Sequence, residues 1–89
     1  MVMDKKEALI YSAEIGADIP ELDLHGFYVK DALEKLESFI FQNYKSDSVV
    51  RIIYGGGTGR LEEAVTEYLK KHPQVEKILK YSGNCLVVF

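Results

Sequence analysis

Two stretches of the chain carry apolar residues at intervals of three or four, a spacing that predicts helices with one buried face. The first helix is expected over about residues 29–44. The second is expected to begin after residues 55–59 and to end at Pro73, which cannot continue a helix. The apolar positions are Val29, Leu33, Leu36, Ile40 and Tyr44 in the first helix, and Leu61, Ala64, Val65, Tyr68 and Leu69 in the second.

Four shorter stretches have the pattern of strands. Residues 21–25 alternate polar and apolar side chains, and residues 49–54 are rich in β-branched ones. Residues 75–80 and 85–89 flank a turn at residues 82–84, which indicates a hairpin. The resulting order, β-α-β-α-β-β, predicts an α/β fold: a two-layer sandwich with a mixed four-stranded sheet and two helices on one face.

The first twenty residues carry no firm periodicity. Their apolar residues suit either a short helix or an extended arm packed on the domain, and both alternatives stay open. We treat residues 1–20 as an N-terminal extension and residues 21–89 as the domain. A chain of 89 residues has room for one such domain.

Composition limits the chemistry that the chain can carry. Hydrophobic residues make up 47% and charged residues 28%, as in an ordinary soluble domain. No apolar run is long enough to cross a membrane, so we expect a cytoplasmic protein with no membrane partner. We also expect a monomer. The single cysteine, Cys85, excludes a disulfide framework or a zinc cluster. It lies in an apolar run, where a buried inert thiol is expected.

The net charge of −3 argues against a protein that binds nucleic acid chiefly through a basic face. A local patch is still conceivable, and Lys45, Arg51 and Arg60 are the residues that would form it.

A glycine-rich segment, residues 55–59 (Gly-Gly-Gly-Thr-Gly), precedes the second predicted helix, and we call it the glycine loop. Free backbone N–H groups and the helix dipole make such a position suited to an anion. ATP and NAD are disfavoured, because the loop lacks a Gly-Lys-Ser/Thr ending and has Arg60 and Glu62 where a dinucleotide fingerprint needs glycine. The alternative is that the glycines only permit positive φ in a tight turn. Glu62 and Glu63 oppose an anion there.

Asp23 and His25 lie two residues apart at the end of the first predicted strand, so their side chains project to the same side. A histidine can accept a proton near neutral pH, and a carboxylate can orient it or hold a divalent cation. The alternative is structural: Asp23 accepts backbone hydrogen bonds and His25 caps the next helix. Tyr54 is either a core aromatic residue or a ring that stacks on a base. His72, at a helix end, is interpreted as a partner of the helix dipole.

Taken together, residues 22–26 (Leu-Asp-Leu-His-Gly), the glycine loop and the ending 83–88 (Gly-Asn-Cys-Leu-Val-Val) resemble the Smr (small MutS-related) domain family. The resemblance implies a sandwich similar to the C-terminal domain of bacterial translation initiation factor three. It also implies nucleic-acid binding, with DNA-nicking or RNA-cleaving endonuclease activity in several relatives. The family's first motif falls on Asp23, His25 and Gly26, and its second motif on Gly55, Gly57, Thr58 and Gly59. The chain departs from the family at Tyr54, where many relatives have histidine, and at Glu62, where many have a basic residue.

The resulting hypothesis is a domain that binds DNA or RNA and holds a backbone phosphate on the N–H groups of residues 57–60. Its expected phosphate-binding and nucleic-acid-binding residues are Gly26, Tyr54, Gly55, Gly56, Gly57, Thr58 and Gly59. Hydrolysis would use His25 as general base or charge stabiliser, Asp23 as its orienting or metal-binding partner, and Arg60 to neutralise charge on the phosphate. A divalent cation such as Mg²⁺ is a possible cofactor. The rival hypothesis is a non-catalytic nucleic-acid adaptor or a protein-interaction module.

Overall fold

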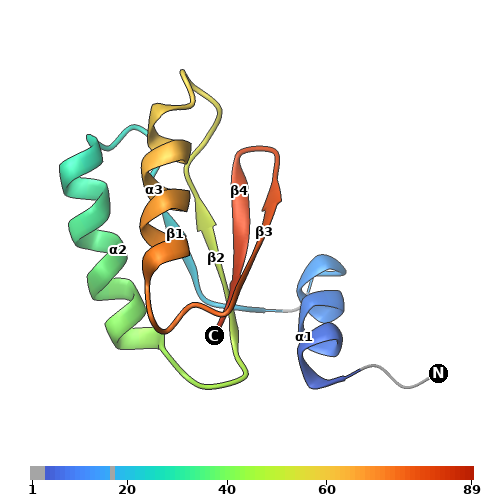
Figure 1. Ribbon diagram of the computed structural model, residues 1–89. Coiled ribbons are helices and arrows are strands. Elements are labelled where there is room, and N and C mark those ends of the chain that lie inside the picture. The colour runs from blue at the N-terminus through green and yellow to red at the C-terminus, as the bar shows by residue number, and fades with distance from the viewer. Residues whose placement is uncertain (1–3, 17) are drawn as a thin grey trace.

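The computed structural model describes residues 4–16 and 18–89, which form one sheet flanked by helices. Along the chain the elements are α1 (Lys5–Glu14), β1 (Glu21–Asp23), α2 (Val29–Asn43), β2 (Val49–Ile53), α3 (Arg60–Lys71), β3 (Lys77–Tyr81) and β4 (Asn84–Val88). The strand order in the sheet is β1-β2-β4-β3, with β1 parallel to β2 and the other two pairs antiparallel. The predicted α/β class, the order β-α-β-α-β-β and the closing hairpin are confirmed (Figure 1).

The helices α2 and α3 lie side by side on one face of the sheet, as predicted (Figure 1). Their buried residues Leu36, Ile40 and Leu69 pack with Val50 and Ile52 of the central strand β2. The apolar stripes expected from the sequence therefore face this core, because a three-to-four residue spacing returns to the same side of a helix.

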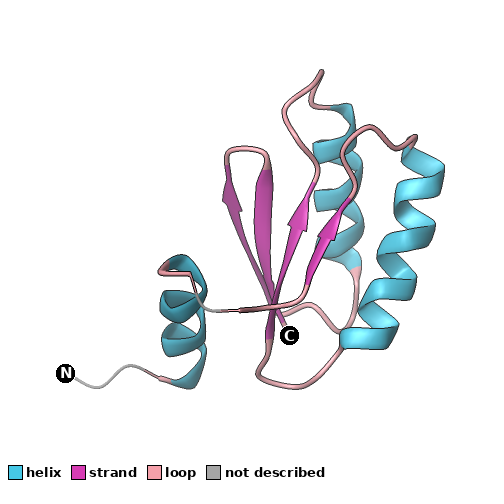
Figure 2. Ribbon diagram, turned by 180° about the vertical axis from the view of Figure 1, so that it is seen from behind, coloured by secondary structure: helices cyan, strands magenta, loops and turns pink. Residues whose placement is uncertain are grey.

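The opposite face of the sheet is covered by α1, so the open choice between helix and arm is settled as a helix (Figure 2). The side chain of Asp4 caps α1 by accepting a hydrogen bond from the Glu7 amide, 2.8 Å away. Ile10 and Ala13 pack against a second cluster on the sheet, formed by Val49, Leu86 and Val88. The two predicted layers are thus joined by a third one that the sequence pattern did not predict.

The burial of both faces explains the composition of β4. Residues 85–88 are all fully buried, with Cys85 and Val87 in the α2/α3 core and Leu86 and Val88 in the α1 cluster. A strand covered on both sides needs no polar positions, so it appears as a continuous apolar run.

Some predicted boundaries differ by a few residues. The strand β1 ends at Asp23 rather than at residue 25, although the Leu24 amide still donates to the carbonyl of Ile53 at 2.7 Å. The strand β3 begins at Lys77 rather than at residue 75, because the Val75 amide closes a turn onto the His72 carbonyl at 3.1 Å. Within residues 4–16 and 18–89, no helix has both the length and the hydropathy to cross a membrane.

Candidate nucleic-acid interface

Three turns meet at one end of the sheet, at the top of Figure 1. Two follow β1 and β2, whose carboxyl ends share an edge because the strands are parallel. The third turn joins β3 to β4, and its Gly83 carbonyl accepts hydrogen bonds from the amides of Tyr54 and Gly55 at 3.0 and 2.9 Å. The glycine loop is thus tied at its first residue to the β3–β4 turn.

His25 lies directly against the start of the glycine loop. A Cβ atom placed on Gly55 would be 3.3 Å from the Cβ of His25, and Gly55 has a φ of +77°, which L side chains rarely adopt. Both facts favour glycine at this position. The two sequence motifs, about thirty residues apart in the chain, are therefore in contact.

Asp23 and His25 form a hydrogen-bonded pair. The Nδ1 of His25 is 2.6 Å from Oδ1 of Asp23, and the same oxygen accepts the His25 backbone N–H at 3.1 Å. The hydrogen bond from the imidazole is the main reason that the pKa of the Asp23 carboxyl lies below its usual value of 3.8. Because the ionised carboxylate accepts the hydrogen bond of Nδ1–H, Nε2 of the neutral ring is left as the proton acceptor. Both side chains are more than half exposed.

The structural alternative for these two residues is only partly met. Asp23 does accept a backbone hydrogen bond, but the donor is His25 itself. The N-cap residue of α2 is Tyr28, and no side chain in the described ranges caps this helix. His25 is therefore not a capping residue, and its imidazole is held by Asp23 alone among the hydrogen bonds of the described residues.

The glycine loop leads into α3 through Gly59, the N-cap residue. The Gly59 amide donates to the Gly56 carbonyl at 3.3 Å, and the Arg60 amide makes a long 3.4 Å contact with the Thr58 hydroxyl. The amides of Gly56, Gly57 and Thr58 have no acceptor in the described part of the chain. Free donors are therefore present at Gly57 and Thr58, within the expected residues 57–60, and at Gly56 directly before them, whereas the amides of Gly59 and Arg60 have acceptors within the loop.

Charges around the loop are arranged differently from the expectation. Glu62 forms an ion pair with Lys80 of β3, with 3.4 Å between Oε2 and Nζ, so part of its negative charge is neutralised. Arg60 opens α3 and is exposed. The local patch considered for Lys45, Arg51 and Arg60 does not form.

Arg51 is engaged in the sheet, and Lys45 lies at the other end of the molecule. The guanidinium of Arg51 donates to the Asn84 side chain at 2.5 Å and pairs with Glu21 at 3.4 Å. Lys45 follows the last turn of α2, which starts near the glycine loop and runs away from it (Figure 1). The side chains that the sequence grouped by charge are separated by the fold.

Tyr54 belongs to the core, which settles the second open choice and corrects its assignment to nucleic-acid binding. It is 3% exposed, and its hydroxyl donates to the Asn84 carbonyl at 3.0 Å. Burial raises the pKa of its phenol to about 12. A ring enclosed in this way has no free face for a base.

Other predicted residues are placed as follows. Gly26 is exposed in the turn after His25, where the Phe27 amide donates to the Leu24 carbonyl at 3.1 Å. Cys85 is fully buried, as expected, and burial raises the pKa of its thiol to about 12, so it stays protonated. No cluster of three histidine, cysteine, aspartate or glutamate side chains able to hold a metal ion occurs among the residues that the structure covers.

Sequence reasoning missed Asn84 as a residue of this end of the sheet. Its side chain accepts from Arg51 and donates to the Ser82 carbonyl at 3.1 Å, while its backbone carbonyl accepts from Tyr54. The available signal was the Ser-Gly-Asn turn, which predicted the hairpin but not its contact with the glycine loop.

Comparisons with known proteins agree with the geometry. A family model described as "Smr domain" matches residues 22–83. The chain is 41% identical over 78 residues to "Endonuclease MutS2" of Listeria welshimeri, covering 83% of this chain and 10% of that protein. It is 44% identical over 63 residues to the protein of the same name from Symbiobacterium thermophilum, covering 64% of this chain and 7% of that one. The crystal structure of the Smr domain of Thermus thermophilus MutS2 superposes with a TM-score of 0.72 at 26% identity, covering 79% of this chain and 96% of that domain. The chain thus spans about a tenth of the length of these relatives.

Proposed function

The chain belongs to the Smr domain family, and we propose that it binds nucleic acid at the end of the sheet where Asp23, His25 and the glycine loop meet. The family resemblance predicted from residues 22–26, the glycine loop and the ending 83–88 is confirmed by the family match over residues 22–83. The observation that carries the proposal is the contact between His25 and Gly55, which brings a hydrogen-bonded carboxylate–imidazole pair to the edge of the glycine loop.

The phosphate would be held by the free amides of Gly56, Gly57 and Thr58. These donors lie at the N-terminus of α3, where the helix dipole favours a negative charge. Arg60 adds a positive charge in the first turn, and the ion pair of Glu62 with Lys80 reduces the repulsion from that carboxylate. The site therefore supplies attraction for one phosphate without a broad basic face.

For hydrolysis we propose that Nε2 of His25 accepts a proton from a water molecule as that water attacks the phosphorus atom. The bond from phosphorus to the leaving oxygen breaks, and this oxygen takes a proton from solvent. Asp23 holds the imidazole in the required tautomer and stabilises the imidazolium that forms. Arg60 and the loop amides stabilise charge on the phosphate oxygens.

A divalent cation fits this site only as a partly hydrated ion. Mg²⁺ commonly uses one or two carboxylates with water and substrate phosphate, and Asp23 is the carboxylate in position here. Bound in this way, the ion would supply charge neutralisation at the phosphate.

The test is cleavage of supercoiled plasmid and of structured RNA by the purified chain, with and without Mg²⁺. We expect His25→Ala and Asp23→Ala to abolish cleavage, and Glu34→Ala, an exposed carboxylate on α2, to leave it unchanged. Cleavage that persists in the double variant Asp23→Ala/His25→Ala contradicts the mechanism.

A second candidate is a non-catalytic adaptor or protein-interaction module. It is favoured by the net charge of −3 and by Tyr54, which fills the core where the family resemblance implies a motif histidine. Binding of an oligonucleotide without turnover, weakened steeply between about 50 and 200 mM salt, identifies the adaptor. Absence of binding at low salt identifies the protein module.

A further inference from the structure

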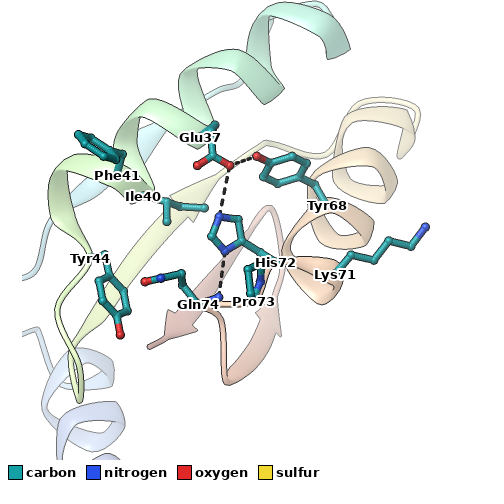
Figure 3. A pocket seen from close by; sticks show the side chains of 9 residues that line it. All are labelled: Glu37, Ile40, Phe41, Tyr44, Tyr68, Lys71, His72, Pro73 and Gln74. Carbon is teal, nitrogen blue, oxygen red and sulfur yellow. Dashed lines mark hydrogen bonds and ion pairs between the residues drawn. The ribbon is translucent and has the colours of Figure 1, made fainter.

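A cavity of about 710 Å³ opens between the C-terminal ends of α2 and α3, at the other end of these helices from the glycine loop (Figure 3). Ile40, Phe41 and Tyr44 line it from the α2 side, and Tyr68 and His72 from the α3 side, with Glu37 between them. Its volume lies in the range of about 300–1,000 Å³ that is usual for binding sites. Since α3 has 12 residues, the cavity is about 18 Å along this helix from the glycine loop.

One oxygen of Glu37 organises the polar wall of the cavity. Its Oε1 accepts a hydrogen bond from the Tyr68 hydroxyl, and it lies 3.2 Å from Nε2 of His72. Nδ1 of His72 accepts the Gln74 amide at 3.1 Å, so the neutral ring carries its proton on Nε2, the nitrogen that faces Glu37. Burial is the main reason that the pKa of the Tyr68 phenol rises to about 12, which keeps this donor protonated.

The second oxygen of Glu37 is available to a ligand. Oε2 receives no hydrogen bond from the residues that the structure describes, and the Glu37 side chain is 51% exposed. A carboxylate oxygen with free lone pairs accepts most strongly from a charged donor. The wall is thus preformed and keeps one acceptor for a cation.

The surroundings of this acceptor are negative and aromatic. The C-terminal ends of α2 and α3 both lie at the cavity, and helix C-termini carry partial negative charge. Lys71 also lines the cavity, but its ammonium is 3.9 Å from Glu67 and points away from Glu37 in Figure 3. Phe41 is 85% exposed and Tyr44 45% exposed, so exposed aromatic surface lines the same cavity as the carboxylate.

We propose that this cavity is a docking site for an arginine side chain carried on an apolar peptide segment of a partner protein. The guanidinium group is cationic, donates to carboxylates in a planar geometry and stacks on aromatic rings, which matches a cavity lined by Glu37, Phe41 and Tyr44. The apolar neighbours of the arginine would cover Ile40 and the exposed rings. A nucleic-acid phosphate does not match, because Glu37 and the two helix ends repel it.

The test uses the acetylated, amidated tripeptide Phe-Arg-Leu as probe, with the same peptide carrying neutral citrulline in place of arginine as its control. We expect the arginine peptide to shift the NMR amide signals of residues 37–44 and 68–74, and to leave those of residues 55–59 unchanged. Glu37→Gln should weaken binding by about tenfold or more, since it removes a charge-assisted hydrogen bond. Glu34→Gln, one turn earlier on α2, should have no effect.

Phe41→Ala gives a second, independent variant, because a side chain that is 85% exposed can be removed without unfolding the domain. This variant should lower the affinity for the arginine peptide several-fold and leave the midpoint of thermal unfolding unchanged. Equal binding of the arginine and citrulline peptides, or the absence of any shift, overturns the proposal. A shift of the amide signals of residues 37–44 caused by an oligonucleotide would also overturn it, because the occupant would then be nucleic acid. A shift that grows with protein concentration alone would overturn it as well, because the occupant would then be a second copy of the chain.

Discussion

Replacing Gly55 by alanine tests the contact on which the nucleic-acid site depends. The new Cβ atom would lie 3.3 Å from the Cβ of His25, closer than ordinary van der Waals contact, so the imidazole must move by a few tenths of an ångström. The backbone φ of +77° at this residue also strains any L side chain. The substitution therefore acts on stability and on the position of His25 at once.

Two neighbouring glycines separate these effects. A Cβ on Gly57 would have no described atom within 4 Å, but its φ is +48°, so Gly57→Ala introduces strain without touching His25. Gly56 has no positive φ and the same open surroundings in the described structure, so Gly56→Ala introduces neither. The strain of a left-handed alanine costs about 1–2 kcal/mol. For a domain of this size that corresponds to a fall in Tm of roughly 4–16 °C.

The assay combines thermal unfolding by circular dichroism with NMR of the His25 imidazole and the cleavage or binding test. We expect Gly55→Ala and Gly57→Ala to lower Tm, and Gly56→Ala to leave it unchanged or raise it, because alanine reduces the entropy of the unfolded chain. Only Gly55→Ala should shift the imidazole signals and reduce activity or binding through His25. If Gly55→Ala and Gly56→Ala give the same Tm and the same imidazole signals, the two motifs are not in contact.

Further predictions concern the core, α1 and the acidic member of the pair. Leu36→Ala, in the fully buried core, should lower the free energy of unfolding by about 2–5 kcal/mol in a urea titration. Phe41→Ala, on the exposed side of the same helix, should change it by no more than about 0.5 kcal/mol. Ile10→Ala should cost about 2 kcal/mol in the same experiment if α1 is part of the folded unit, and no change would show that α1 is not bound to the sheet. His25→Ala should raise the pKa of Asp23 toward 3.8, measured by NMR titration of its carboxyl carbon. A carboxyl with a lowered folded pKa stabilises the fold above its unfolded pKa, so this contribution should fade as pH falls through the folded value, and an unchanged Asp23 titration would contradict the hydrogen bond.

The fold was predictable from the sequence because its strongest signals are local. The apolar stripes of α2 and α3, the β-branched residues of β2 and the turn before β4 each lie within a short window, and each predicted element was found. The helix α1 was not settled, because only Ile10 and Ala13 of its ten residues are buried and two positions make no stripe. Its packing depends on Val49, Leu86 and Val88, which are distant in the chain.

The candidate site was predictable where parallel strands decide the geometry and not where tertiary packing does. Asp23, His25 and Gly55 were brought together because two parallel neighbouring strands end at the same edge. The environment of Tyr54 could not be predicted, since its enclosure depends on Asn84, thirty positions later. The cavity wall was missed for the same reason: Glu37 and Tyr68 are 31 positions apart, and His72 alone indicates only a helix end.

The two parts of the nucleic-acid site differ in what holds them. The pairing of Asp23 with His25 spans two residues and needs only local backbone geometry. The position of the glycine loop beside His25 depends instead on the Gly83 carbonyl, which accepts two amides from the start of the loop, and so on the hairpin that carries Gly83. The β3–β4 hairpin contributes only Lys80, the ion-pair partner of Glu62, to the proposed site, yet it also sets the position of the loop amides relative to the imidazole. Substitutions that loosen this turn should therefore impair the site while leaving the Asp23–His25 hydrogen bond in place.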